Sequence, residues 1–123
     1  MLEMKACSDF AKYAHVIPQN CLAPMIVESV DGDNVQGFVI FEYDENLVVI
    51  HALGCDDDLA LCDGLVRTAL FKGLMSGILQ AKINLGDDEK SIDMCRKLRF
   101  FKNTDDIIDI DYVLGGCKGC TKK

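Results

Sequence analysis

Two side chains in this sequence could act as bases. His51 is the one polar residue in the apolar run 47–53, and it could take a proton from an amine or from bound water. Its alternative role is that of a buried histidine bonded to a neighbour. Glu42 is a second candidate base, with a solvated glutamate near a strand end as the alternative. If Tyr43 pairs with Leu47 across the hairpin, Glu42 and His51 point to opposite faces, and a one-residue slip or a bulge would reverse that.

Cysteine is the other residue type that could do chemistry here. The chain has 7 cysteines, at positions 7, 21, 55, 62, 95, 117 and 120. Cys117 and Cys120 form a C-x-x-C pair, which could hold half of a tetrahedral zinc site or close a redox disulfide. Cys55 and Cys62 are candidates for the remaining ligands. The sequence has no second C-x-x-C or histidine pair, so zinc is not favoured, and residues 115–123 are also consistent with a flexible tail of reduced thiols that follows two glycines.

Length and charge limit the functions that these residues could serve. The chain has 123 residues, which predicts one domain, over residues 1–114, before the tail. With 13 Lys and Arg against 20 Asp and Glu, the net charge is -7, which argues against nucleic acid or an anionic membrane as partner. Without a secretory signal or a membrane-length apolar run, we expect a cytoplasmic protein with reduced cysteines.

The pattern of apolar residues predicts the elements that position the candidate bases. Helical spacing is expected at residues 6–17, at 57–76, and in a helix that begins at Asp87 or Asp88. Strand patterns occupy residues 25–30, 35–43, 47–53, 78–83 and 106–114. The order predicts an α/β protein with an antiparallel meander followed by a β-α-β crossover, in a mixed sheet with helices on its faces. Strands 47–53 and 78–83 should be parallel, because a helix joins them.

Residues 36–101 carry a resemblance to a known family. The pieces that carry it are the hairpin FVIFEYDENLVVIHAL, the helix DGLVRTALFKGLMSG, the strand ILQAKI and the ending CRKLRFFKN. Together they resemble the core of the GNAT-type N-acyltransferases. The resemblance implies direct transfer of an acyl group from acetyl-CoA, or another acyl-CoA, to a small-molecule amine.

The resemblance also implies a set of site residues. Pantetheine would pair with the strand edge from His51 through Ala52 and Leu53 to Gly54, and backbone N–H groups near Leu53 would stabilise the oxyanion. The pyrophosphate would lie on the turn that opens the following helix. That turn comprises Leu61, Asp63, Gly64, Leu65, Val66 and Arg67. Cys95 aligns with the family's tyrosine that is proposed to protonate the leaving thiolate, although packing is the simpler role for this residue.

Several residues depart from the family pattern. Leu61 stands where the family has Gln or Arg, and Val66 stands where it has a small residue. The approach to the turn is acidic, with Asp56, Asp57 and Asp58, and these carboxylates would repel phosphates. The alternative function is therefore a catalytically degenerate module with a binding, metal- or thiol-sensing, or interaction role. A homodimer through the sheet edge or the tail is compatible with either function.

Overall fold

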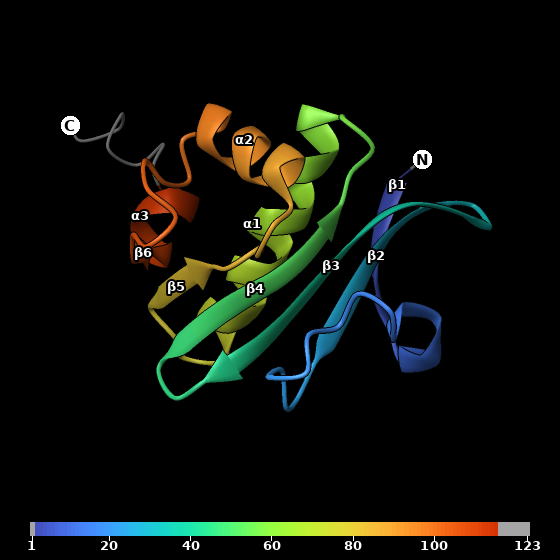
Figure 1. Cartoon of the computed structure of the whole chain (residues 1–123), viewed down its shortest axis with the longest axis horizontal. Coiled ribbons are helices and arrows are strands. Elements are labelled where there is room, and N and C mark those ends of the chain that lie inside the picture. Colours follow the sequence, from blue (N-terminus) through green and yellow to red (C-terminus); the bar gives the residue numbers. More distant parts are fainter. Residues whose placement is uncertain (1, 116–123) are drawn as a thin grey trace.

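The fold is known from a computed structural model that describes residues 2–115 (Figure 1). Its elements, in chain order, are β1 (Leu2–Cys7), the 3-10 helix η1 (Phe10–Tyr13), β2 (Met25–Asp31), β3 (Asn34–Asp44), β4 (Leu47–Gly54), α1 (Leu59–Met75), β5 (Gln80–Ile83), α2 (Glu89–Lys97), β6 (Ile108–Asp109) and α3 (Ile110–Leu114). The strands form one sheet in the order β1-β2-β3-β4-β5-β6. None of the helices in these described residues is long and apolar enough to cross a membrane.

The sheet is antiparallel except at one place. β1 to β4 form an antiparallel meander, α1 then crosses over, and β5 pairs in parallel with β4. β6 returns antiparallel to β5. The predicted mixed sheet and its β-α-β crossover are therefore confirmed. The predicted strands at 25–30, 35–43, 47–53 and 78–83, and the helices that follow the last two, lie within one or two residues of the observed elements.

The helix predicted over residues 6–17 is wrong. Residues 2–7 instead form β1, which pairs with β2 along its whole length, and only Phe10–Tyr13 forms a short 3-10 helix. Tyr13 is the buried residue of that turn, and its ring lies 4.6 Å from the ring of Phe38, centre to centre. The apolar spacing of this segment thus reflects one buried anchor on the sheet and not a continuous helical stripe.

The strand predicted over residues 106–114 is also wrong for most of its length. β6 has only two residues, which pair with Gln80 and Ala81. The Asp109 carboxylate then accepts a hydrogen bond from the Tyr112 N–H at 3.1 Å and begins α3. Residues after Asp109 would lie opposite residues before Gln80, where β5 has not begun, so the capped helix forms there in place of a longer strand.

The core lies on both faces of the sheet. The larger cluster packs α1 and α2 against one face and includes Val39, Phe41 and Ile50. The smaller cluster lies on the opposite face, where Tyr13 packs against Ile26 and Ile40. Residues alternate between the two clusters along β3, as the pleat of a strand requires.

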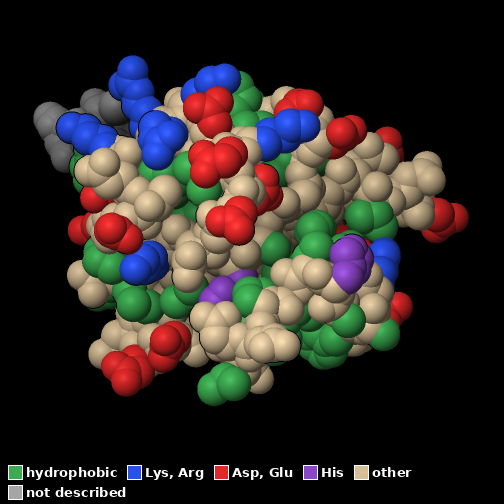
Figure 2. All heavy atoms as spheres, viewed as in Figure 1, with side chains coloured by type: hydrophobic (Ala, Val, Ile, Leu, Met, Phe, Trp, Pro, Cys, Tyr) green, Lys and Arg blue, Asp and Glu red, His purple; other side chains and the backbone are tan. Residues whose placement is uncertain are grey.

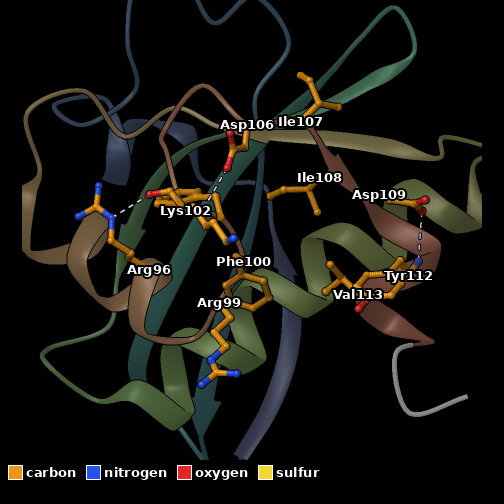
Figure 3. Close-up of a pocket in the computed structure, with 11 residues that line it drawn as sticks. Arg96, Arg99, Phe100, Lys102, Asp106, Ile107, Ile108, Asp109, Tyr112 and Val113 are labelled. Atoms are coloured by element: carbon orange, nitrogen blue, oxygen red, sulfur yellow. Dashed lines mark hydrogen bonds between the residues drawn. The ribbon is translucent and has the colours of Figure 1, made fainter. Parts of the chain in front are cut away.

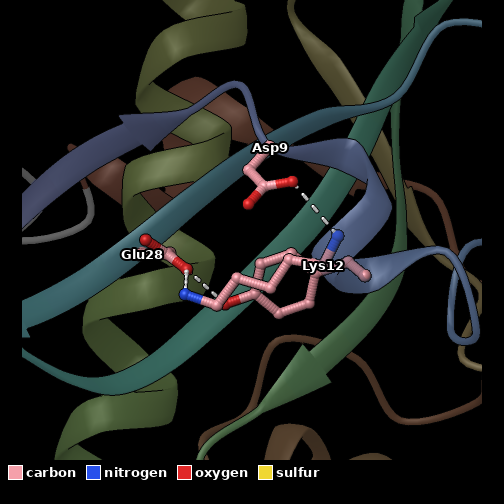
Figure 4. Close-up of polar contacts among 4 residues, drawn as sticks. Asp9, Lys12 and Glu28 are labelled. Carbon is pink, nitrogen blue, oxygen red and sulfur yellow. Dashed lines mark hydrogen bonds and ion pairs between the residues drawn. The ribbon is translucent and has the colours of Figure 1, made fainter.

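A polar cluster fixes η1 and the following loop to that second face. The Lys12 ammonium lies 2.8 Å from the Glu28 carboxylate on β2 (Figure 4), and the hydroxyl of Tyr13 donates to the same carboxylate. Asp9 caps the turn by accepting from the Lys12 N–H at 3.3 Å. These contacts direct the chain from η1 across the sheet, so that the loop before β2 covers β3 and β4.

Candidate functional site

Glu42 on β3 and His51 on β4 face each other. Their Oε2 and Nε2 atoms are 2.6 Å apart, and each side chain is buried. The expected pairing of Tyr43 with Leu47 is wrong, because Asp44 pairs with Leu47 and Tyr43 with Val48. That one-residue slip places the two candidate bases on the same face of the sheet, the second of the two arrangements that the sequence left open.

A β-bulge completes this arrangement. The register shifts between Ile40 and Phe41, which pair with Ala52 and Ile50, so His51 is the extra residue of β4. A bulge re-aims side chains locally and is common beside functional sites. Here it leaves His51 and Ala52 on the face opposite α1, since Ala52 packs in the smaller cluster while Ile50 packs under the helix.

The sheet divides next to His51. β4 and β5 are paired from Leu47 and Gln80 as far as Ile50 and Ile83, and the last bond is from the Asn84 N–H to the Ile50 carbonyl at 2.8 Å. Beyond this point the last four residues of β4 have β3 as their only strand neighbour among the described residues. We call this place the fork. It includes the predicted pantetheine edge at Ala52, Leu53 and Gly54.

A cavity of about 320 Å³ opens at the fork. Its lining comes from the bulge, from the segment after β5 and from the loop after η1: His51, Asn84, Leu85, Gly86, Val16, Pro18 and Asn20. The site therefore has His51 at one wall, with Glu42 bonded to it, and beside it the edge of β4 that has left β5. Such a cavity can hold a small substrate group with its reacting atoms near the His51 imidazole.

Hydrogen bonds keep the Glu42 carboxylate ionised. Burial favours its neutral form, but hydrogen bonds from His51, from the Ala23 N–H and from the Cys21 thiol outweigh burial and lower the pKa of Glu42. The Leu22 N–H also donates to its other oxygen, at 3.3 Å. Burial and the neighbouring carboxylate raise the pKa of Cys21 to about 11. The loop before β2 thus supplies donors to Glu42, which was not apparent from the sequence.

The N-terminus of α1 is capped by the chain itself. Asp58 accepts a hydrogen bond from the Leu61 N–H at 3.1 Å, and Asp56 and Asp57 adopt left-handed conformations in the preceding turn. Lys90 lies 3.1 Å from the Asp57 carboxylate. Figure 2 shows acidic side chains interspersed with Lys and Arg side chains over the upper part of the molecule, where α2 and the start of α1 lie. The expected pyrophosphate position is thus rich in carboxylates.

The side chains predicted for the pyrophosphate turn point away from a ligand. Leu61, Leu65 and Val66 are buried in the core, so that only their backbone could reach a bound molecule. Gly64 faces β1, since a Cβ added there would lie 3.1 Å from the terminal methyl of Met4. These four residues hold α1 on the sheet.

The charged members of that turn are paired within the protein. Arg67 donates through Nε to the Asp63 carboxylate at 2.9 Å and through a terminal nitrogen to the Val113 carbonyl at 3.1 Å. The guanidinium therefore connects α1 to α3, and it lies over the ring of Phe100 at 5.7 Å. A phosphate at the start of α1 would need another cation.

Cys95 lies in a group of buried thiols that is separate from the fork. Its side chain is fully buried on α2, and the thiols of Cys55 and Cys62 are its neighbours. Both Cys95 and Cys55 donate hydrogen bonds to Cys62, and these bonds lower the pKa of Cys62. The same bonds raise the pKa values of the two donors, and burial of the donors raises them further. None of the three lines the fork cavity. The predicted metal ligands Cys117 and Cys120 lie outside the described residues.

A larger hollow, of about 780 Å³, lies elsewhere (Figure 3). It lies between the end of α2 and α3, with Phe100 and Ile108 among its apolar residues. Two of its polar side chains are bonded within the chain: Arg96 donates to the Lys102 carbonyl at 3.1 Å, and the Asp106 carboxylate accepts from the Lys102 N–H at 3.0 Å. It contains none of the predicted site residues, so the fork is the better candidate for chemistry.

Comparison with known proteins supports the fold. No family model matches the sequence, and no curated protein is significantly similar to it. Among solved structures, the IAA acetyltransferase from Bacillus cereus has a TM-score of 0.61 at 13% identity, with 82% of this chain and 79% of that chain covered. The ribosomal-protein-S18-alanine N-acetyltransferase from Escherichia coli has a TM-score of 0.59 at 10% identity, with 82% and 78% covered.

A third similar structure was solved with a ligand. The PaiA N-acetyltransferase from Thermoplasma acidophilum, in complex with coenzyme A, has a TM-score of 0.51 at 14% identity, with 73% of this chain and 62% of that chain covered. At these identities the likeness concerns the arrangement of the elements. The mixed sheet, its crossover and these three matches lead to one conclusion: this chain has the fold of the GNAT-type N-acyltransferases.

Proposed function

We propose that this protein is an N-acyltransferase that moves an acyl group directly from an acyl-CoA, acetyl-CoA in the simplest case, to an amine. The observation that carries the proposal is the fork, where β4 leaves β5 at Ile50 and His51, bonded to Glu42 behind it, forms part of the wall of the resulting cavity. The similar structures support it, since each is described as an acetyltransferase.

The Glu42–His51 pair would serve as the base. The amine nitrogen attacks the thioester carbonyl, a C–N bond forms, the C–S bond breaks, and the sulfur leaves as a thiolate. The proton released by the amine passes to His51, directly or through water in the cavity, and the ionised Glu42 stabilises the resulting imidazolium. Water can protonate the leaving thiolate. Backbone N–H groups of the free edge near Leu53 would stabilise the oxyanion.

The two ends of an acyl-CoA fit this chain unequally. The free edge from Ala52 to Gly54 suits an extended pantetheine, because main-chain groups there have no second strand neighbour in the described residues. The start of α1 suits a pyrophosphate poorly, because the Asp58 carboxylate caps the helix and Asp57 is close by. We therefore expect the affinity for CoA to come from the pantetheine arm, with a KM for acetyl-CoA that rises little with salt.

Turnover measurements test the proposal. The protein is assayed for CoA release with acetyl-CoA and a panel of small amines. Glu42→Gln and His51→Gln should each lower kcat by about 10²- to 10⁴-fold, the usual range for removal of a general base, and should leave the KM for acetyl-CoA nearly unchanged. Glu45→Gln and His15→Gln are matched controls, because both residues are exposed and lie outside the fork.

A catalytically inactive module is the second candidate, and the acidic cap of α1 is the observation that favours it. Calorimetry separates the two functions. Heat of acetyl-CoA binding with turnover supports the transferase, and binding without turnover on any amine supports the module. Absence of both binding and thermal stabilisation at millimolar acetyl-CoA would overturn the proposed transferase.

A further inference from the structure

Three potential metal ligands from separate segments meet beside the fork. Cys21 comes from the loop after η1, Glu42 from β3 and His51 from the bulge in β4, and their ligand atoms all lie within 4.8 Å of one another. Each residue is buried, with 8% of its surface exposed. We infer that Cys21, Glu42 and His51 form a binding site for a zinc-type divalent cation, with three protein ligands. The transferase proposal is not required for this inference.

The donor set suits Zn²⁺ in particular. A thiolate, a carboxylate and an imidazole are the three ligand types that zinc takes in proteins, whereas Mg²⁺ and Ca²⁺ prefer oxygen ligands only. A thiolate and a carboxylate carry two negative charges, so the ion would make the buried group neutral as a whole. The usual zinc bond lengths place any two ligand atoms of a tetrahedral zinc about 3.3 to 3.5 Å from each other. The Glu42–His51 separation of 2.6 Å must lengthen by about 0.7 Å, and a separation at the 4.8 Å limit of the cluster must shorten by about 1.3 Å to match them.

The surrounding backbone already holds the ligands in place. The Cys21 N–H donates to the Pro18 carbonyl at 3.0 Å, which fixes the turn that carries the thiol. The Leu22 N–H donates to the Glu42 Oε1 atom at 3.3 Å and leaves Oε2, the atom that faces His51, for the metal. Partners of this kind orient metal ligands and strengthen binding.

The fourth position of the ion would be open to substrate or water. His51 lines the fork cavity, while Cys21 and Glu42 do not, so the ion would sit at the inner wall of that cavity. Three protein ligands with an open fourth position are typical of zinc sites that contact a small molecule, whereas structural zinc usually has four protein ligands. Zinc binding would replace the proton of the Cys21 thiol.

Zinc and the proposed base would compete for the same atoms. The ion needs the lone pairs of Glu42 Oε2 and His51 Nε2, and so it would break the hydrogen bond through which Glu42 stabilises the imidazolium that forms when the other ring nitrogen of His51 receives the proton of the amine. If the proposed function is correct, zinc should inhibit acyl transfer. This consequence depends on the transferase proposal, whereas metal binding itself can be measured without acyl-CoA.

Cobalt and zinc titrations of metal-free full-length protein test the site. The protein carries Cys117→Ser and Cys120→Ser, so that the C-x-x-C pair cannot bind the ion. We expect one Co²⁺ per chain with a thiolate-to-cobalt charge-transfer band, and displacement of Co²⁺ by Zn²⁺. Cys21→Ser should abolish the band and weaken Zn²⁺ binding by more than about 100-fold, and His51→Gln should weaken it similarly while leaving the thiol in place.

Cys62→Ala and Cys7→Ser are the matched controls and should leave the band and the affinity unchanged. Zinc should also raise the melting temperature of the protein, and this shift should be absent in the Cys21→Ser and His51→Gln variants. Three results would overturn the inference: no stoichiometric binding, binding that persists in both ligand variants, or binding that is lost in Cys62→Ala. If Cys21→Ser fails to fold, the outcome is decided with His51→Gln.

Discussion

Helix α1 lies against β4 at Gly73, and the absence of a side chain there permits the contact. A Cβ added at Gly73 would overlap the Cγ2 methyl of Val48, which is fully buried on β4. Gly73→Ala should therefore force the helix and the strand apart, at a cost of about 3 kcal/mol, the upper end for overpacked cores. Alanine is a better helix former than glycine by about 1 kcal/mol, so the net loss should be about 2 kcal/mol.

Gly64→Ala in the same helix is the matched control. Its Cβ would meet only the mobile end of Met4, at 3.1 Å, so the helix-propensity gain should dominate and stability should rise by up to about 1 kcal/mol. Urea unfolding measures both changes. In thermal unfolding, about 2 kcal/mol corresponds to a fall of about 8 °C in Tm for a domain of this size.

A double-mutant cycle with Val48→Ala isolates the contact. Without Cγ2, the nearest Val48 atom is Cβ, 3.6 Å from the added Cβ, which is an ordinary van der Waals distance. Gly73→Ala should then be neutral or stabilising in the Val48→Ala background, with a coupling energy of about 3 kcal/mol. If Gly73→Ala costs the same in both backgrounds, the contact with Val48 is not the cause and the reasoning is refuted.

Three further predictions concern Glu28, Asp58 and Cys7. Burial alone would raise the pKa of Glu28, but hydrogen bonds from Lys12 and Tyr13 outweigh burial and lower the pKa. The ionised Glu28 therefore stabilises the folded state. This contribution is fully present above the unfolded pKa of about 4.3 and is lost as the pH falls through the lower folded pKa. Wild type should therefore lose more stability to urea than Glu28→Gln between about pH 6 and about pH 3. Asp58→Ala should cost about 1 kcal/mol through loss of the cap of α1, whereas Asp58→Asn should keep most of that stability in the same urea assay. Cys7, the one described cysteine that is not buried, should be alkylated first in mass-spectrometric mapping.

Each of these predictions has a result that would contradict it. Equal acid sensitivity of wild type and Glu28→Gln would mean that the Glu28 contacts do not stabilise the folded state. If Asp58→Asn is as unstable as Asp58→Ala, loss of the helix cap does not explain the lower stability of Asp58→Ala. Faster labelling of Cys21 than of Cys7 would show that the loop over β3 opens readily, which would also weaken the inferred metal site.

The central part of the fold could be predicted from the sequence because its signals are strong and local. The run at residues 47–53 is apolar on both faces, as a central strand requires, and the change to helical spacing after residue 57 marks the crossover. The ends of the chain gave weaker signals. β1 is an edge strand whose described side chains are mostly exposed and whose stability comes from pairing with β2. Its alternation of apolar and charged residues covers only residues 2–6, and helical spacing overlaps it from residue 6.

Two of the candidate bases were named from the sequence, but the geometry that brings them together was not. His51 and Glu42 stood out by type, but their contact depends on the length of the turn between their strands. The hairpin loop is Glu45 and Asn46, with Glu45 in a left-handed conformation, whereas a three-residue loop would have placed the bases on opposite faces. Cys21 was not distinguished from the other cysteines, because its position beside Glu42 and His51 depends on how the loop before β2 crosses the sheet.

The fork gives one strand two environments, and amide hydrogen exchange should register the difference. The first half of β4, from Leu47 to Ile50, has a strand on each side, so its amides should open only when the sheet itself unfolds. The second half, up to Gly54, is bordered by β3 alone and should exchange sooner. A molecule bound along the free edge would slow amide exchange there without altering exchange in the first half of β4. The first half can therefore serve as an internal reference when binding at the edge is measured.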